Sequence, residues 1–218
     1  MLRWWKILCI VLLFYTIVAG FLVPVPRLPI LNETIRNLYF HVTMWFAMII
    51  HMIVAMVYSV KYLRSNQIKN DLIAEMFSIT AMVFGVAGLI TGMIWAKHTW
   101  GAYWVNDTKL NGAAAAMLIY SSYFILRNAM SDPMKRARIA GVYIIFAFMM
   151  MMVFIFVLPR LTDSLHPGNG GNPAFSNYDL DKNMRLVFYP AIIGWSLLGV
   201  WITTLQIRIK NIWRVLEE

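Results

Sequence analysis

Apolar runs of about 20 residues recur along the whole chain, and each is long enough to cross the roughly 30 Å hydrocarbon core of a bilayer. Only 13% of the 218 residues are charged, about half the share found in soluble domains. Six membrane spans are predicted, at residues 4–23, 36–60, 72–96, 112–130, 138–158 and 184–207. The sequence therefore predicts an all-α polytopic integral membrane protein, with a single six-helix membrane domain over residues 1–218.

The first span has some features of a secretory signal, because Arg3 and Lys6 lie at its start. It is longer than a typical signal h-region, and PVPRLP follows it instead of a cleavage site with small residues, so it is interpreted as a retained helix. Cys9 is the only cysteine, and the chain has no C-x-x-C-H motif. The sequence thus excludes an internal disulfide and covalently attached c-type haem.

The basic residues are distributed unevenly between the two sides that six spans would create. With the N-terminus in the cytoplasm, twelve lysines and arginines lie inside and seven outside. The inner group comprises Arg3, Lys6, Lys61, Arg64, Lys69, Arg127, Lys135, Arg136, Arg138, Arg208, Lys210 and Arg214; the outer group comprises Arg27, Arg36, Lys97, Lys109, Arg160, Lys182 and Arg185. The positive-inside rule predicts that both termini are cytoplasmic. It also explains the net charge of +9 without a nucleic-acid partner.

The unusual connections lie on the predicted external face. They include a tryptophan-rich loop at residues 97–111 and a loop at 159–183 that is rich in Gly, Asn and Pro, a composition typical of turns. The cytoplasmic connections are short and basic, and the chain has no nucleotide-binding glycine loop and no Ser–His–Asp arrangement. We therefore expect any chemistry to be located on the external face, and we expect no catalytic residues.

Two of the four histidines are candidate metal ligands. His41 lies about one turn inside the second span, and His166 lies in the last external loop. Ionisable residues inside a membrane are costly and often mark function, and imidazole is a common axial ligand of haem iron. His41 is either such a ligand or an interfacial histidine bonded to a backbone carbonyl. His166 is either a ligand or a solvated loop residue.

The other two histidines have simpler interpretations. His98 abuts the membrane surface and is typical of an interfacial belt. His51 lies ten residues after His41, deeper in the bilayer and about 80° further round the helix. A polar contact between packed helices explains it without a ligand.

Residues 100–107 read WGAYWVND, which concentrates aromatic side chains at the predicted membrane surface. The stretch is either an aromatic belt or a platform for a flat, apolar ligand. If it forms a short helix, one face carries, at spacings i, i+3, i+4 and i+7, Trp100, Tyr103, Trp104 and Asp107. Such a helix would lie along the membrane surface with its rings on one side. Asn106 would lie off that face.

Three separated motifs resemble one family. RNLYFHV at 36–42, WGAYWVNDTKL at 100–110 and LTDSLHPG at 161–168 are similar to the CcmC family of cytochrome c maturation proteins. This family belongs to a wider haem-handling superfamily that includes the CcsA-type cytochrome c synthases. The six-helix layout covers essentially the whole chain, and all three motifs fall on the predicted external face. The tryptophan-rich motif is highly specific to this superfamily.

The resemblance implies that His41 and His166 are the two axial ligands of a non-covalently bound haem b. Four residues match the family pattern W-G-x-W-W-x-W-D directly, namely Trp100, Gly101, Trp104 and Asp107. Tyr103 replaces a tryptophan and keeps a ring, whereas Asn106 replaces another and does not.

Two basic residues are candidates for pairing with the haem propionates. Arg36 matches the family's arginine before the first ligand, and Lys109 replaces an arginine of the second motif. The alternative for both is an interfacial side chain that extends its charge into water.

The function implied by the resemblance is haem delivery at the outer face of the bacterial cytoplasmic (inner) membrane during cytochrome c maturation. Implied partners are haem, a periplasmic haem chaperone of the CcmE type, the ABC-transporter subunits CcmA and CcmB, the small membrane protein CcmD, and membrane lipid. No nucleic acid is expected. The protein would not be an enzyme, because the iron supplies the chemistry and the protein supplies binding and orientation.

Three alternatives were weighed. A b-type electron-transfer subunit pairs histidines on facing helices, yet His41 and His51, the two histidines clearly within a span, share one helix. A complete CcsA-like cytochrome c synthase is larger, and this chain has no additional helices or external domain to hold an apocytochrome. A purely structural scaffold leaves the three motifs unexplained.

Overall fold

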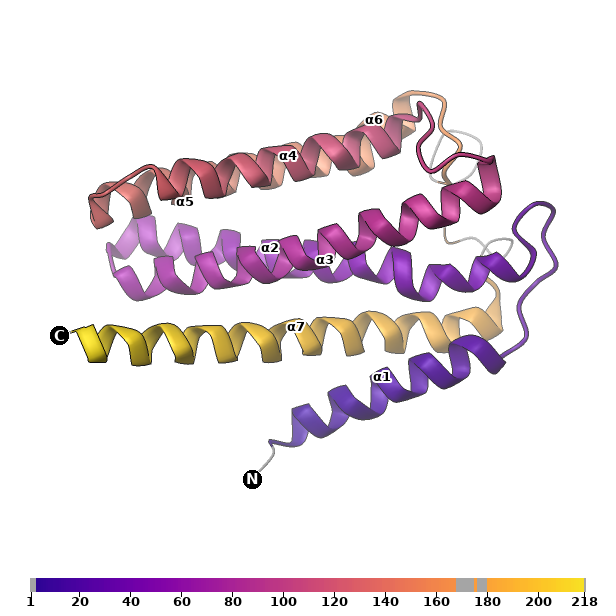
Figure 1. Cartoon of the computed structure of the whole chain (residues 1–218), viewed down its shortest axis with the longest axis horizontal. Coiled ribbons are helices and arrows are strands. Elements are labelled where there is room, and N and C mark those ends of the chain that lie inside the picture. The colour runs from indigo at the N-terminus through magenta and orange to yellow at the C-terminus, as the bar shows by residue number, and fades with distance from the viewer. Residues whose placement is uncertain (1–2, 168–174, 176–179, 218) are drawn as a thin grey trace.

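The computed structural model describes residues 3–167, 175 and 180–217, and the regular structure in these parts of the chain is helical (Figure 1). The elements in order are α1 (Trp4–Leu22), the 3-10 helix η1 (Asn32–Asn37), α2 (Leu38–Ser65), α3 (Ile68–Trp100), α4 (Thr108–Asn128), α5 (Pro133–Met152), the π-helix η2 (Val153–Val157), α6 (Leu158–Leu161) and α7 (Lys182–Glu217). The predicted all-α membrane fold is confirmed.

Five helical stretches in the described residues are long and apolar enough to cross a membrane. They are Trp4–Leu22, Asn32–Ser65, Ile68–Trp100, Pro133–Leu161 and Lys182–Leu216. The sixth predicted span corresponds to α4, which is less apolar because polar and basic residues occupy both of its ends. Its 21 residues still extend about 31 Å, at 1.5 Å per residue, and it packs along α5.

Most helices are longer than the apolar runs that predicted them. α3 reaches Trp100 and α4 begins at Thr108, so the external connection between them is only residues 101–107. Capping residues set these limits. Asn66 and Gly101 adopt left-handed conformations after α2 and α3, and the side chains of Asp107 and Asp132 cap α4 and α5.

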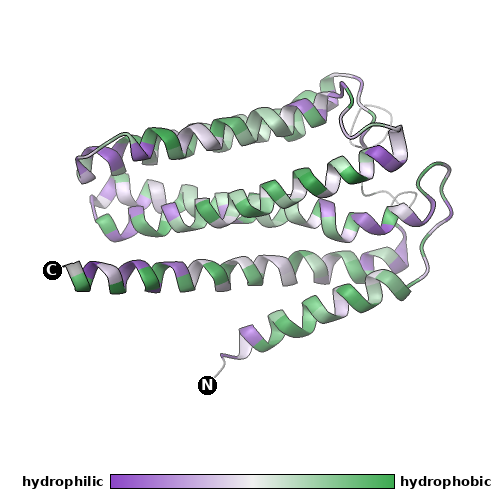
Figure 2. Ribbon diagram, in the orientation of Figure 1, coloured by the Kyte–Doolittle hydropathy of each residue, from purple (hydrophilic) through white to green (hydrophobic). Residues whose placement is uncertain are grey.

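α2 is the central helix of the bundle. It packs against α3 most extensively and also against α5 and α7, while α1 packs mainly on α7. Figure 1 shows the resulting tiers, with α4 and α5 on one side of α2 and α3, and α7 and α1 on the other. Figure 2 shows hydrophilic residues gathered toward the two ends of the bundle, as expected where the helices leave the hydrocarbon.

Both ends of the described chain lie at the same end of the bundle (Figure 1). At that end a buried ion pair joins α3 to α4. The Arg127 guanidinium donates to both carboxylate oxygens of Asp71, at 2.8 and 2.6 Å, and lies 3.0 Å from Glu75. A buried charge left without its partner is strongly destabilising, so this pair fixes how the two helices meet.

The opposite end contains a break in helix geometry. η2 connects α5 to α6 as one continuous helical run with a π-helical turn in it. Gly112 of α4 allows this turn to approach closely, because a Cβ at that position would lie 2.6 Å from the Phe154 carbonyl oxygen. The segment carries two apolar side chains, Ile155 and Phe156, to the wall of a cavity described next.

Candidate functional site: a two-histidine pocket

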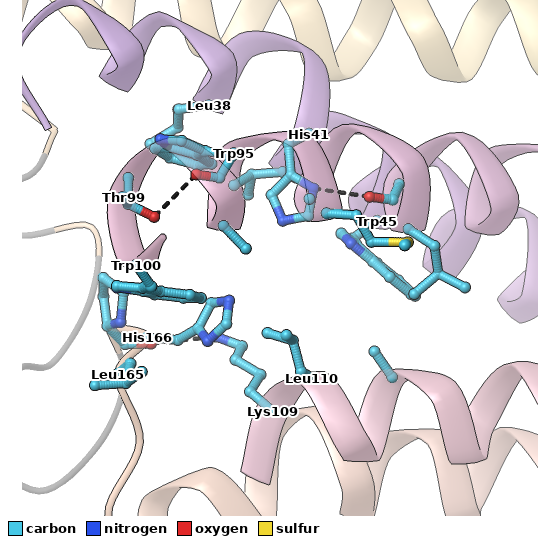
Figure 3. A pocket seen from close by; sticks show the side chains of 18 of the residues that line it. Leu38, His41, Trp45, Trp95, Thr99, Trp100, Lys109, Leu110, Leu165 and His166 are labelled. Atoms are coloured by element: carbon cyan, nitrogen blue, oxygen red, sulfur yellow. Dashed lines mark hydrogen bonds between the residues drawn. The ribbon is translucent and has the colours of Figure 1, made fainter. Parts of the chain in front are cut away.

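A cavity of about 400 Å³ lies at the end of the bundle opposite the termini. Its walls come from α2, α3, the start of α4, η2 and the segment after α6. Most of the lining is apolar, and its aromatic, basic and histidine members are His41, Trp45, Phe46, Trp95, Trp100, Trp104, Lys109, Phe156, His166 and Phe175. The fold therefore brings His41 and His166, 125 positions apart in the sequence, into one pocket (Figure 3).

The His41 imidazole is oriented by the backbone of α3. Its Nδ1 lies 2.9 Å from the Gly88 carbonyl oxygen and 3.4 Å from the Thr91 hydroxyl. A carbonyl oxygen only accepts, so Nδ1 must carry the proton and donate it. The neutral ring then has its lone pair on Nε2, which is the atom available to a metal.

Packing fixes the same ring from two further sides. A Cβ at Gly92 would lie 2.6 Å from His41 Cε1, so only glycine leaves room for the imidazole there. Trp95 meets the ring edge-on, with centroids 5.8 Å apart, and its Nε1 donates to the Thr34 hydroxyl at 3.1 Å. His41 is therefore seated between two closely packed helices.

His166 is oriented by a carboxylate instead. Its Nδ1 lies 2.9 Å from Asp107 Oδ1, and the edge of the ring meets Trp100, with centroids 4.9 Å apart. Because an ionised carboxylate only accepts, His166 also donates through Nδ1 and presents Nε2 to the pocket. Figure 3 shows the unengaged edges of the two imidazoles facing the same hollow.

Asp107 also organises the segment that carries His166. Its Oδ1 caps α4 by accepting from the backbone N–H groups of Lys109 and Leu110, at 3.0 and 3.2 Å. Its Oδ2 accepts from the Ser164 hydroxyl at 2.8 Å and from the Leu165 N–H at 2.7 Å. One buried carboxylate therefore starts a helix, docks a loop and orients an imidazole.

These bonds determine the charge of the carboxyl group. Burial alone would raise the pKa of Asp107, but the hydrogen bonds from His166, the Leu165 N–H and Ser164 outweigh it and hold the pKa well below its usual range. Asp107 is therefore ionised at neutral pH and remains an acceptor for His166.

The predicted surface helix over 100–107 is wrong. Trp100 is the last residue of α3, Gly101 ends that helix at φ +83°, and residues 104–107 have no regular structure before α4 begins. Gly101 is thus a helix terminator and does not line the pocket. Asp107 is not on an aromatic face, because it lies behind His166 as the partner of the ring.

The aromatic residues of this stretch separate into two groups. Trp100 and Trp104 line the pocket, whereas the Tyr103 side chain is 56% exposed, lies 5.8 Å from Lys97 Nζ, and does not line it. The geometry therefore favours the platform interpretation for the two tryptophans and the belt interpretation for Tyr103.

Asn106 has a supporting position that the helical interpretation missed. Its side-chain oxygen accepts from Asn111 Nδ2 at 2.8 Å, and Asn111 Oδ1 in turn accepts from Trp104 Nε1 at 3.3 Å. The residue that replaces the family's tryptophan therefore helps to hold the Trp104 ring at the pocket rim.

The two candidate propionate partners are placed differently. Lys109 lines the pocket, with Nζ 3.1 Å from the Pro167 carbonyl oxygen. Arg36 does not line it, because its guanidinium binds Glu33 at 2.7 Å and the carbonyl oxygens of Gly20 and Val23 at 3.0 and 2.6 Å. The structure assigns Arg36 to holding the chain after α1 against η1.

The remaining histidines lie outside the pocket. His98 is exposed near the end of α3. His51 is fully buried, with Nδ1 2.7 Å from the Ala47 carbonyl oxygen and its ring between Phe77 and Phe84. Its position agrees with a helix-packing contact.

Four residues that shape the pocket were not singled out from the sequence: Trp45, Gly92, Trp95 and Asn111. A tryptophan in an apolar run carries no signal that separates a pocket wall from a lipid contact. Gly92 did carry a usable signal, because glycine inside a helix interior often has a packing reason.

Comparison with known proteins identifies the family. The family described as heme exporter protein C (CcmC) matches residues 1–217. The protein of that name from Escherichia coli K12 is 25% identical over 179 residues, covering 81% of this chain and 70% of the relative. Those from Haemophilus influenzae and Rhodobacter capsulatus are 26% and 24% identical, covering 75% and 81% of this chain and 63% and 73% of the relatives. With its three motifs gathered around one pocket, this multi-pass membrane protein belongs to the CcmC family.

Proposed function

We propose that this protein holds haem b non-covalently between His41 and His166 at the outer face of the cytoplasmic membrane, and delivers it for cytochrome c maturation. The observation that carries the proposal is the matched seating of the two imidazoles. Each engages Nδ1 with a fixed acceptor and turns Nε2 toward one apolar pocket. Metal-binding histidines usually have such a carbonyl or carboxylate partner.

The rest of the pocket suits the same ligand. Haem is a flat, apolar ring with two carboxylates at one edge, and Trp100 and Trp104 offer rings that could pack against it. Lys109 lies at the rim, where a cation can pair with a propionate. When bound, the haem iron supplies two axial coordination positions for histidine ligands.

Delivery requires that one ligand can leave. His166 lies on an irregular segment, and its contacts with Asp107 and Trp100 are few compared with the helical packing around His41. Withdrawal of this segment would open the site without disturbing the bundle. The receiver in this proposal is a periplasmic haem chaperone of the CcmE type, and CcmA, CcmB and CcmD are the membrane partners.

The proposed orientation places the pocket in the periplasm and both termini in the cytoplasm. It rests on the twelve-to-seven distribution of basic residues and on the location of both termini away from the pocket. Cysteines introduced singly at Ser65 and Tyr103, in a Cys9→Ala background, test it with a membrane-impermeant thiol reagent. Tyr103→Cys should be labelled from outside and Ser65→Cys only after the membrane is opened; the reverse pattern would rule out a periplasmic pocket.

A visible spectrum of the purified protein tests ligation. The protein should bind haem with the low-spin spectrum of two histidine ligands, and His41→Ala or His166→Ala should each abolish that spectrum. His51→Ala is the matched control, because His51 lies on the same helix as His41 but outside the pocket. Loss of the spectrum in His51→Ala, with His166→Ala unchanged, would favour an electron-transfer haem within the membrane instead.

A further inference from the structure

We propose that the pocket opens sideways into the bilayer between α3 and α4, and that its apolar ligand enters and leaves edge-on through this opening. The identity of the ligand as haem rests on the proposed function. The route rests on how α3 and α4 pack along their lengths.

α3 and α4 are tied together at both ends. At the end with the termini, Arg127 binds Asp71 and Glu75, and at the other end the seven residues of the 101–107 connection join the helices. Between these ties α3 packs extensively on α2 but meets α4 at few residues. Their contact at mid-length is between Met117 and Gly85. The two helices are therefore held at their ends and are loosely packed between them.

One face of α3 lines two hollows in succession. It carries apolar residues at alternating spacings of three and four: Ile79, Met82, Val86, Leu89 and Met93. This spacing normally forms the interlocked seam between two packed helices. Here the first three line a separate apolar hollow that also involves Phe124 of α4, and the last two line the ligand pocket. The seam that would close α3 onto α4 is left open.

Exposure along this face places the opening toward lipid. Met93 lines the pocket and is also 36% exposed, although it lies within a membrane-spanning stretch. Val86, next to the second hollow, is 47% exposed. The described lining of that hollow is entirely apolar, so it offers hydrogen bonds neither to water nor to a polar ligand. Its chemistry suits an apolar ring that comes from the hydrocarbon.

The polar groups of the pocket are all near its outer end. Lys109 and His166 belong to the start of α4 and the segment after α6, and Leu110 and Ala113 follow on the inner side of α4. A ring that slides in between Met93 and Leu110 would keep its carboxylates at the level of Lys109. No charge would then need to cross the hydrocarbon, which is the costly step for such a molecule.

A reversible cross-link across the opening tests the route. Met93→Cys and Leu110→Cys are introduced together in a Cys9→Ala background and joined by a short bifunctional reagent that contains a disulfide. The protein is reconstituted in vesicles, haem is equilibrated with the lipid, and growth of the two-histidine spectrum is followed. Cross-linking should slow loading about tenfold, because association that waits for an opening is slow, and reduction of the linker should restore it.

The control pair is Tyr15→Cys with Leu186→Cys, which joins α1 to α7 where the Tyr15 hydroxyl already contacts the Leu186 carbonyl oxygen at 3.1 Å. This cross-link should leave loading unchanged. Equal loading rates with the α3–α4 cross-link open and closed would overturn the lateral route. If the uncross-linked protein shows no two-histidine spectrum, haem binding itself is wrong and the route falls with it.

A bulky substitution gives an independent test without chemistry. Met93→Trp narrows the opening, whereas Ile90→Trp adds the same ring at a neighbouring position that is 54% exposed and does not line the pocket. Met93→Trp should slow loading from lipid while the final amplitude of the spectrum stays near that of Ile90→Trp. A Met93→Trp protein that loads as fast as the control would contradict the proposal.

Discussion

His41 and His166 face the same pocket but are supported in different ways. His41 projects from the middle of two closely packed helices, and its ring is fixed by a backbone carbonyl, by the space at Gly92 and by Trp95. His166 projects from an irregular segment, and its ring is fixed mainly by Asp107 and Trp100. The comparison teaches that the bundle builds one permanent ligand position and one that a few contacts can release.

The largest expected effect distinguishes the two positions by rescue. His41→Ala and His166→Ala should both abolish the two-histidine spectrum, but free imidazole should restore it mainly in His166→Ala. The reason is access, because the His166 side chain is 20% exposed whereas His41 lies against the interior of the bundle. The measurement is an imidazole titration followed by visible absorption. Equal rescue of the two variants would remove the distinction drawn above.

Asp107→Ala should have the next largest effect. It removes the acceptor for His166, the cap of α4 and the docking of residues 164–165 together. Loss of the partner of a metal-binding histidine typically weakens the site by about 10–100-fold, and loss of a helix cap costs about 1 kcal/mol. Asp107→Asn is the control, since asparagine caps helices as well as aspartate does. Haem retention should fall in the order parent, Asn, Ala; equal retention in all three would show that the carboxylate does not position the ligand.

Gly92→Ala should damage the other ligand position while leaving His166 in place. The added Cβ would lie 2.6 Å from His41 Cε1 and 3.0 Å from its Nδ1, so the imidazole has to move. A five-coordinate spectrum is expected. Gly101→Ala is the matched control, because a Cβ there meets nothing within 4 Å and the cost is limited to about 1 kcal/mol for the positive φ. A two-histidine spectrum in Gly92→Ala would show that His41 does not need its present seat.

Trp104→Ala should have a smaller effect, measured as haem per protein molecule in the same membranes. An aromatic contact contributes roughly 0.5–1.5 kcal/mol beyond burial, which corresponds to a few-fold loss of occupancy. Asn106→Ala should produce part of that loss, since Asn106 supports Trp104 through Asn111. Tyr103→Ala should produce none, because Tyr103 does not line the pocket. A drop in protein level at constant occupancy would identify the stretch as an interfacial belt.

The smallest effect is expected from mild acid acting on the Asp107 contact. Although burial alone would raise it, hydrogen bonds hold the pKa of Asp107 below its usual range. A lowered folded-state pKa stabilises fully above the unfolded value, near pH 4, and the contribution is lost only as the pH falls through the lowered value. Moving from about pH 7 to about pH 5 should leave the difference in haem retention between the parent and Asp107→Asn unchanged. A difference that disappears within this window would contradict an ionised Asp107.

Hydropathy predicted the number and order of the long helices but not where they end. Apolar runs report the thickness of the hydrocarbon, whereas the helices continue to capping residues such as Gly101 and Asp107. Both caps were readable, because glycine favours helix C-termini and aspartate favours N-termini. The spacing argument for a surface helix ignored these signals, and for that reason it failed at residues 100–107.

The candidate site was predictable through its motifs and only in part through its geometry. His41, His166, Trp100, Trp104 and Lys109 line one pocket, as the resemblance implied. Arg36 does not, since its partners, the Gly20 and Val23 carbonyl oxygens, belong to the distant end of α1. Contacts of this kind depend on how helices pack, which periodicity in a single sequence does not specify.

The π-helical segment η2 makes the chain sensitive to length rather than to composition. A π turn closes its hydrogen bond one residue later than an α turn, so it absorbs one additional residue inside an otherwise α-helical run. Deleting one residue there would turn everything that follows by about 100° relative to α5. The segment that follows α6 carries His166. A one-codon deletion in Val153–Val157 would therefore misdirect this ligand while preserving every side chain of the pocket's other walls.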